Sequence, residues 1–241
     1  YIRKRNLSIT ISNRLPNDVA NVNSGVVYIF TSAQSFIKRS NSFPVLWYNI
    51  RMKDQLIAEL EKEIQPDKIE TFAPYFGVAP GKYGEGDILL AIHTPNLRKI
   101  CKKYREMPEN EIVELLRSPV HDYRFAGLVL LREQFKKFGD KSKDLYLANL
   151  ESVNNWDLVD ESAPNILGCW CYEHKDENIL ADLHNHKDKL WHKRIAIVAY
   201  LYFYRKKTLG NGLEIIDDSL EDSHPLIQKA CGWMLRNIYA K

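Results

Sequence analysis

Apolar positions recur at helical spacing along most of the chain. The first such stripe follows Met52 and consists of Leu56, Ile57, Leu60 and Ile64. Segments with the same period follow at 95–107, 109–118, 122–138, 142–153, 155–173, 177–187, 190–207, 211–221 and 225–240, with turn-forming residues between them. Apolar side chains three and four residues apart share one face of a helix. The pattern therefore predicts an all-α fold from residue 52 onward.

Two stretches depart from this pattern. Segment 74–87 (PYFGVAPGKYGEGD) holds four glycines and two prolines, which predicts a loop. Segment 1–51 is rich in Ser and Asn, and its short apolar runs 25–30 and 43–47 could be strands, although no partner strand follows. The first methionine is Met52. We expect 1–51 to be a leader, an adventitious extension or a poorly ordered arm, and 52–241 to be the folded domain.

The helical segments also repeat. HDYRFAGLVLL, LWHKRIAIVAYL and PLIQKACGWML superpose with Arg124, Arg194 and Lys229 in register, at intervals of 70 and 35 residues. A period of 35 residues, built from a short helix and a longer apolar one, is typical of HEAT or armadillo solenoids. We predict a right-handed, armadillo-like superhelix of HEAT-like repeats. Basic residues at equivalent positions would then line its concave face.

Charge is unevenly distributed along the 241 residues. The net charge is +3, but segment 1–51 contains seven basic residues and one acid, which leaves 27 basic and 30 acidic residues in 52–241. A domain with slightly more acidic than basic residues can bind nucleic acid only if its Lys and Arg gather on one face, because phosphates are neutralised locally. The basic segment 1–51 has a second interpretation as a DNA-binding arm.

Several classes of protein and site are not supported. There is no apolar run of 18 residues for a membrane span and no apolar stretch after YIRKR for a signal peptide. Four cysteines give no disulfide framework, which favours an intracellular protein. Cys169 and Cys171 lie two apart in one helix and point to different faces, so we interpret them as buried small residues and expect no metal. GKYGEG lacks the strand and the Lys-Ser/Thr of a phosphate loop, and no cofactor is expected.

The helix that starts near Asn154 carries the most unusual chemistry. Asn154 or Asn155 can cap it by accepting a backbone N–H. Trp156 and Asp160 are four residues apart and share a face. An electron-rich indole beside a carboxylate suits a developing cation, such as the sugar of a breaking glycosidic bond. The alternative is a core tryptophan beside a salt-bridged aspartate.

Two further residues stand out only in a wider context. Arg194 follows Trp191 by three residues, and Trp233 lies in another of the in-register segments. By themselves, an arginine on a repeat helix is usually a surface ion pair and a tryptophan is usually a core residue.

Five motifs, found at 75–87, 94–104, 154–160, 191–199 and 228–236, together resemble a known family. They are YFGVAPGKYGEGD, TPNLRKICKKY, NNWDLVD, WHKRIAIVA and QKACGWMLR, and they resemble the AlkD-type DNA alkylation repair proteins over residues 53–241, in a subgroup with a GxYGEGD loop. The resemblance implies a HEAT-like solenoid whose concave, positively charged face grips duplex DNA. It also implies a bacterial-type protein that is a monomer, lies in the cytoplasm and is associated with the nucleoid. It implies a DNA glycosylase that excises N3- and N7-alkylated purines without a metal and without flipping the base into a pocket.

The resemblance also implies roles for single residues. Trp156 and Trp233 would contact the deoxyribose of the lesion, Asp160 would stabilise the sugar cation and place water, and Arg194 would hold the DNA backbone. Phosphate contacts would come from Lys193, Arg194, Lys229 and Arg236. The chemistry is consistent, because an alkylated purine is already a cationic leaving group and needs no general acid. One carboxylate and two indole faces can stabilise the remaining charge.

Two other functions stay open. The loop at 75–87 stands where the well-known active members have a compact helical N-terminus, and a subgroup lacking part of that DNA-gripping region could bind DNA structures with weak or no glycosylase activity. A protein-interaction scaffold is the third possibility, because the concave face of a HEAT solenoid need not be basic.

Overall fold

The computed structural model describes residues 51–186 and 189–239. The chain divides into two units, Tyr1–Trp47 and Tyr48–Lys241, and all described residues belong to the second. The runs 25–30 and 43–47, considered above as strands, lie outside the described residues. The interpretation of segment 1–51 therefore stays a prediction.

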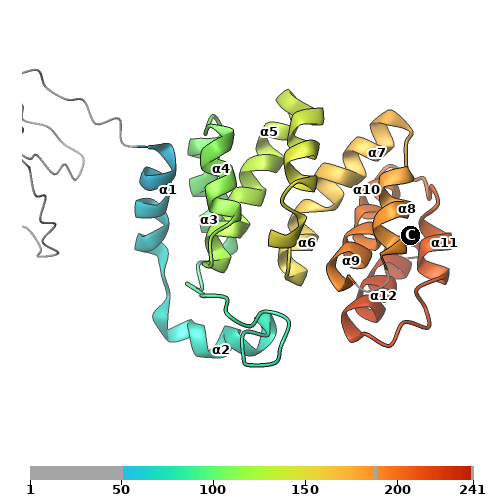
Figure 1. Cartoon of the computed structure of the whole chain (residues 1–241), viewed down its shortest axis with the longest axis horizontal. Helices are drawn as coiled ribbons and strands as arrows, with labels where there is room; N and C mark the ends of the chain where they lie inside the picture. The colour runs from blue at the N-terminus through green and yellow to red at the C-terminus, as the bar shows by residue number, and fades with distance from the viewer. Residues whose placement is uncertain (1–50, 187–188, 240–241) are drawn as a thin grey trace, which may run out of the picture. The chain divides into compact units, whose positions relative to one another are not determined.

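Helices make up the regular structure of the described residues (Figure 1). They are α1 (Met52–Leu60), α2 (Pro66–Phe76), α3 (Thr94–Cys101), α4 (Glu109–Leu116), α5 (His121–Leu147), α6 (Trp156–Ser162), α7 (Cys169–His174), α8 (Asn178–Asn185), α9 (Leu190–Ala199), α10 (Leu201–Arg205), α11 (Gly212–Asp217) and α12 (Pro225–Tyr239). Short 3-10 turns cover Glu61–Glu63, Lys102–Tyr104 and Leu150–Ser152, and a π-helical turn covers Pro164–Gly168. No helix in this part of the chain is long and apolar enough to cross a membrane.

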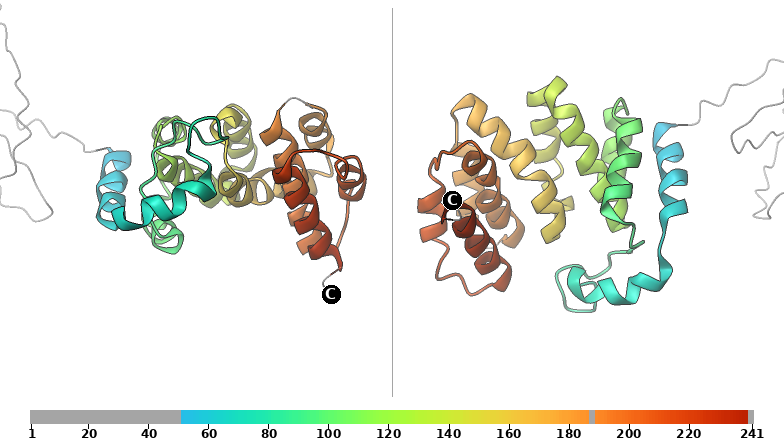
Figure 2. Two further views of the ribbon diagram at one scale, coloured as in Figure 1. Left: turned by 90° about the horizontal axis from the view of Figure 1, so that it is seen from below. Right: turned by 180° about the vertical axis from the view of Figure 1, so that it is seen from behind.

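Successive helices pack against one another in chain order. Helix α4 contacts α5, α5 contacts α6, α6 contacts α9, and α9 contacts both α8 and α12. Figures 1 and 2 show this succession within residues 51–239, with the amphipathic helices set side by side. These helices cover the apolar faces of their neighbours, as stacked repeats do, whereas α2 has no buried residue. The predicted all-α solenoid of helical repeats is confirmed.

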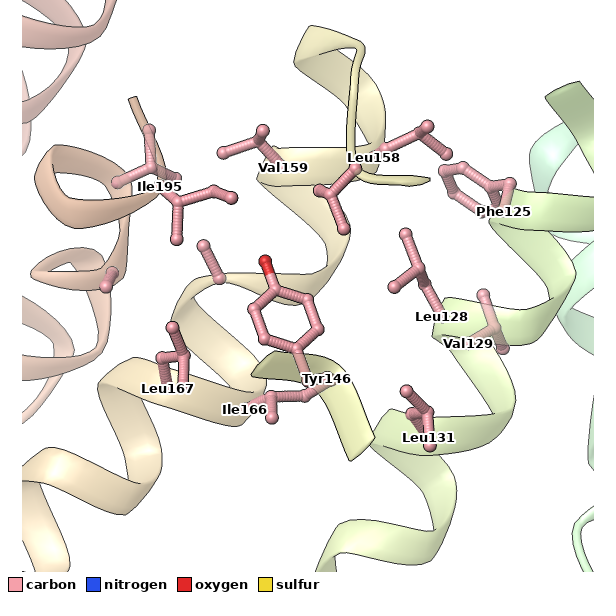
Figure 3. Packing of buried hydrophobic residues seen from close by; sticks show 14 of the residues in the cluster. Phe125, Leu128, Val129, Leu131, Tyr146, Leu158, Val159, Ile166, Leu167 and Ile195 are labelled. Carbon is pink, nitrogen blue, oxygen red and sulfur yellow. The ribbon is translucent and has the colours of Figure 1, made fainter. Parts of the chain in front are cut away.

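One apolar core runs through these helices and fixes α6. In its central part, Tyr146 lies among Leu128, Ile166 and Leu167 (Figure 3). Its side chain is 1% exposed, and its hydroxyl is bonded to the Ser162 hydroxyl at 3.0 Å, so the one polar atom of the ring has a partner. This packing holds α6 between α5 and α9. The opposite side of α6 is left for the residues of the candidate site.

Helix α2 extends three residues beyond the predicted start of the loop. Pro74 lies inside its last turn, and the helix ends at Phe76. Gly77 supplies the stop: it adopts a left-handed conformation with φ of +62°, and its N–H donates to the Ala73 carbonyl. A glycine at this position ends helices because it takes positive φ without steric cost. The prediction that the loop begins at Pro74 was wrong.

Two other predicted helix boundaries have different outcomes. The break predicted between segments 122–138 and 142–153 is confirmed by a kink within α5 at Phe138, where φ is −134° and ψ is 44°, although the second segment ends at Leu147 and not at 153. The single helix predicted at 155–173 is instead α6, a π-helical turn and α7. Pro164 begins the π-helical turn. A proline clashes with the preceding turn and lacks a donor, and a π turn can absorb both defects.

Candidate active site

A buried arginine joins three helices in the candidate site. Arg194 of α9 is 4% exposed. Its Nη2 donates to Asp160 Oδ1 of α6 at 2.8 Å, and its Nη1 donates to the Leu226 carbonyl of α12 at 2.6 Å. A buried charge is tolerated when it is paired and hydrogen-bonded. The helices that carry Trp156 and Trp233 are therefore attached to one guanidinium group.

The carboxylate of Asp160 is fixed at one oxygen and open at the other. The side chain is 25% exposed, and among the described residues no group is hydrogen-bonded to Oδ2. Burial raises the pKa of Asp160 and the charge of Asp157 adds to this, while Arg194 opposes both; the net direction is upward. The alternatives predicted from sequence were an open carboxylate or a salt-bridged one, and Asp160 combines features of both.

The indole of Trp156 is held by the C-terminal end of α2. Its Nε1 donates to the Tyr75 carbonyl at 2.9 Å, and its ring stacks on Phe76 with centroids 5.7 Å apart and planes 14° apart. Asn155 caps α6 by accepting the Trp156 N–H at 2.9 Å and donates its amide to the Phe76 carbonyl at 2.9 Å. The last carbonyls of a helix have no donors of their own, and here the start of α6 supplies them. Capping by Asn155 confirms one of the two predicted caps.

The loop after α2 folds back over the end of that helix. The Gly84 N–H donates to the Gly77 carbonyl at 2.9 Å. A Cβ at position 84 would lie 2.3 Å from the Phe76 carbonyl oxygen and 3.3 Å from the Asn155 amide nitrogen. Only glycine fits so close an approach. Gly84 of GKYGEG thus serves the packing of the loop, whereas Gly81 and Gly86 adopt positive φ with no atom near the Cβ position.

Tyr83 connects this loop to two further aromatic residues. Its hydroxyl donates to the Tyr75 carbonyl at 2.7 Å, the same oxygen that accepts the Trp156 indole. Its ring meets the Trp191 ring edge-on, with centroids 5.6 Å apart. Burial and the charge of Asp157 raise the pKa of Tyr83, against the opposing effect of a nearby guanidinium. The loop thus reaches both α6 and α9, the helices joined by the buried ion pair.

A second group of buried charges was not predicted from the sequence. His121 Nε2 lies 2.8 Å from Asp157 Oδ2, and its Nδ1 lies 3.4 Å from Asp87 Oδ2, which also accepts from Arg124 Nη2 at 2.5 Å. Burial tends to lower the pKa of His121, but its hydrogen bonds to the two aspartates outweigh burial and raise the pKa to about 9. The group ties the end of the loop to α5 and α6.

One sequence signal could have pointed to this buried group. Each bonded pair in the group joins residues that are 34 to 37 positions apart in sequence, so no local motif contains both members of a pair. His121 and Arg124 stand 70 residues before Trp191 and Arg194, and in both pairs the arginine is buried and bonded to an aspartate. The repeat register therefore carries the information that separate motifs lack.

The expected DNA-binding residues have different surroundings. Lys229, Trp233 and Arg236 are spaced by four and three residues on α12 and share one face; both basic side chains are exposed and the tryptophan is half-buried. Lys193 is instead paired with Asp222 at 2.6 Å, and its side chain is 13% exposed. The roles of these residues toward DNA stay predictions.

Fewer of the basic residues at equivalent repeat positions reach the surface than expected, so the surface is less positive there. Arg124 and Arg194 are each 4% exposed and paired with a carboxylate, whereas Lys229 is exposed. An arginine between packed repeat helices is stabilised by an aspartate of the neighbouring segment, so its charge is neutralised inside the stack. The expectation that all three would line a positive face therefore does not hold for the two arginines.

The cysteines are core residues. Cys169 and Cys171 are both buried, as predicted, and burial raises the pKa of Cys171 to about 12. Within the described ranges, no group of three or more His, Cys, Asp or Glu residues has an arrangement that could hold a metal ion.

Comparison with protein families identifies the chain. The model of the family described as DNA alkylation repair enzyme matches residues 56–241. The chain belongs to this DNA alkylation repair enzyme family. A comparison with curated proteins gave no match. The resemblance drawn from the five motifs is thus confirmed for the family, while the subgroup with the GxYGEGD loop stays a prediction. Membership implies a DNA repair enzyme whose partner is DNA.

Proposed function

We propose that this member of the DNA alkylation repair enzyme family is a glycosylase that hydrolyses the N-glycosidic bond of N3- and N7-alkylated purines in duplex DNA, as a monomer. The observation that carries the proposal is the Asp160 carboxylate, which Arg194 holds by one oxygen while the other oxygen is open. Family membership supports DNA as the substrate.

The proposed reaction needs little from the protein beyond charge stabilisation. Alkylation at N3 or N7 gives the purine a positive charge, so it leaves as a neutral base when the bond to C1′ of the sugar breaks. The positive charge moves to the sugar, which has oxocarbenium character. Asp160 would stabilise this cation electrostatically. Its open oxygen would accept a hydrogen bond from the water that adds to C1′. The added water then loses a proton, to this carboxylate or to solvent, and the sugar becomes neutral.

Arg194 is proposed to position the Asp160 carboxylate and to join the helices that form the site. Its bonds to Asp160 and to the Leu226 carbonyl keep α6 and α12 at a fixed separation. The rings of Trp156 and Trp233, on those two helices, would then present electron-rich faces to the sugar. A carboxylate whose charge is partly balanced by an arginine also costs less to keep in a half-buried site.

Release of 7-methylguanine from methylated duplex DNA tests the proposal. Asp160→Asn keeps the size of the side chain and removes its charge, so it should reduce the excision rate by about 100-fold or more, as loss of one electrostatic stabiliser does. Asp218→Asn, at an exposed aspartate after α11, is the matched control and should excise at the wild-type rate. Equal release by wild type and Asp160→Asn would contradict catalysis through this carboxylate.

A second candidate is a DNA-structure-binding protein with weak or no excision. The observation that favours it is the ion pair itself, because Arg194 partly neutralises the carboxylate that the reaction needs. In this case wild type and Asp160→Asn would bind branched or bulged DNA equally well, and neither would release alkylated base.

A further inference from the structure

A polar hollow of about 710 Å³ lies between α5, α10 and the segment formed by the π-helical turn and α7. Its lining includes Lys136 of α5, Asn165 of the π-helical turn and Tyr202 of α10. Two further cations contact this lining: Arg205 Nη1 donates to Asn165 Oδ1 at 3.3 Å, and Lys206 Nζ lies 5.3 Å from the centre of the Tyr202 ring. We call Lys136, Arg205 and Lys206 the hollow cations.

The positive charge of the hollow is only partly balanced. All three hollow cations are exposed, and among the residues that the structure describes none of them forms an ion pair with a carboxylate. The lining also holds two acids. Glu133 is paired with Arg132 at 2.9 Å, whereas Glu173 accepts from the Cys169 thiol at 3.4 Å and has no cationic partner in this part of the chain. Three uncompensated positive charges therefore surround one uncompensated negative charge, which favours an anionic ligand.

The hollow lies on the same face of the helices as the candidate site. Along α6 and α7 a single stripe connects them, at intervals of four, five, four and four residues, and the interval of five falls at the π-helical turn, whose bonds join residues five apart. The stripe consists of Trp156, Asp160, Asn165, Cys169 and Glu173, and the last three line the hollow. Along α9 and α10, Arg205 follows Arg194 by eleven residues, or three helical turns. At a rise of 1.5 Å per residue, the hollow is about 14–16 Å from Asp160 and Arg194.

We propose that this hollow binds the sugar-phosphate backbone of the DNA strand opposite the strand at Asp160. Each groove of a duplex is bordered by both strands and is about 6 Å wide for the minor and about 12 Å wide for the major groove. A duplex with one backbone at Asp160 therefore brings the other backbone within reach of the hollow cations. Such phosphate contacts fix the position of the duplex without reading its sequence. The choice of DNA rests on the proposed function, and none of the hollow cations belongs to the five motifs of the family resemblance.

Salt titration of the binding of the full chain to an undamaged duplex tests the inference. The triple variant Lys136→Gln, Arg205→Gln, Lys206→Gln removes three charges at exposed side chains, so it should fold as the wild type does. The logarithm of its binding constant should fall less steeply with the logarithm of salt concentration, by about 2.7 in slope, which is about 0.9 for each lost phosphate contact. An unchanged slope would overturn the inference.

A second triple variant controls for the loss of net charge. Lys103→Gln, Lys137→Gln, Lys141→Gln also removes three positive charges, from exposed lysines that are paired with carboxylates and do not line the hollow. It should keep the wild-type slope. An equal reduction in both triple variants would overturn the inference, because the effect would then come from net charge and not from contacts at the hollow.

Neutral methylphosphonate linkages test which strand lies at the hollow. The duplex carries one 7-methylguanine, and the Asp160→Asn chain is used because it should hold this lesion without releasing the base. Substituting the three hollow cations should still reduce the slope when the lesion strand carries the methylphosphonates. The same substitution should have no effect when the opposite strand carries them, because that strand then has no charge to lose. An equal effect on both duplexes would overturn the inference.

Failure of the inference and failure of the proposed function are separable. Binding to an undamaged duplex involves no excision, so its salt dependence reports on the hollow alone. A wild-type chain that releases 7-methylguanine, together with a hollow variant of unchanged slope, would overturn the hollow assignment and leave the glycosylase proposal standing. A reduced slope in the hollow variant of a chain that does not excise would support the hollow assignment and overturn the glycosylase proposal.

Discussion

Trp156 has two roles at once, as a packed ring and as part of the lining of a cavity of about 360 Å³ between α2, α3, α5 and α6. Its indole stacks on Phe76 and donates to the Tyr75 carbonyl, yet the residue is only half-buried. Trp156→Phe keeps a ring for stacking and loses one hydrogen bond, so it should reduce the free energy of unfolding by about 1 kcal/mol. Urea denaturation measures this loss.

Trp156→Ala is the informative comparison at the same position. A fully buried tryptophan costs about 3–5 kcal/mol when truncated to alanine. We expect a smaller loss here, because part of the ring already faces the cavity and the site. A loss in the full range for a core residue would instead favour the interpretation of Trp156 as a core tryptophan beside a salt-bridged aspartate.

Because of His121, the domain should become less stable as the pH rises. Its pKa rises from 6.5 to about 9 in the folded chain, so the folded state binds this proton more tightly than the unfolded state. The contribution to stability is complete below pH 6.5 and is lost as the pH rises through about 9. By linkage it is on the order of 3 kcal/mol. Thermal unfolding across this pH interval should therefore show a falling Tm.

Two variants separate His121 from other titrating groups. His121→Gln should have a lower Tm at pH 6.5 and a flatter profile above it, because the ion pairs to Asp157 and Asp87 are gone. His174→Gln, at a side chain that is 46% exposed, should follow the wild-type profile. A wild-type Tm that stays constant over the interval would show that His121 is not held in its charged form.

At the scale of elements, α2 and its loop are attached to the first turn of α6 by a few hydrogen bonds. Asn155 is fully buried and acts both as the cap of α6 and as a donor to the Phe76 carbonyl. Asn155→Asp keeps the capping oxygen but turns a carboxylate toward that carbonyl. We expect α6 to persist and α2 with its loop to detach, since an acceptor facing an acceptor is unfavourable.

Hydrogen exchange measured by mass spectrometry can follow this detachment. Peptides from 66–90 should exchange faster in Asn155→Asp than in the wild type, while peptides from α9 and α12 should be unchanged. Asn211→Asp, at an exposed asparagine before α11, is the control and should change neither region. Equal protection of 66–90 in all three proteins would mean that other contacts hold α2 in place.

Sequence periodicity predicted the helices well but missed what depends on backbone detail. The apolar stripe gave the start of α1 at Met52, whereas the end of α2 is set by the left-handed Gly77 and not by Pro74. The spacing of four residues put Trp156 and Asp160 on one face. The bond from Arg194 to Asp160 joins residues 34 apart, and the chemistry of a single helix carries no information about such a partner.

At the scale of the whole domain, buried ion pairs remove positive charge that the repeat pattern had suggested. Arg124 and Arg194 are neutralised by Asp87 and Asp160 inside the helical stack. Residues 52–241 also carry three more acidic than basic side chains. Attraction to DNA would therefore come from exposed basic residues that gather on one face. This makes the salt dependence of binding a direct measure of how many take part.

The last prediction concerns Lys229 and Arg236, which flank Trp233 on one face of α12. The logarithm of the DNA-binding constant falls linearly with the logarithm of salt concentration, by about 0.9 for each phosphate contact. Lys229→Ala and Arg236→Ala should each reduce this slope by about one and weaken binding for all sequences alike. Lys141→Ala, at a side chain of α5 paired with Glu109, should leave the slope unchanged. A wild-type slope near zero would remove DNA as the partner and favour a protein-interaction scaffold, because only phosphate contacts release counterions in this proportion.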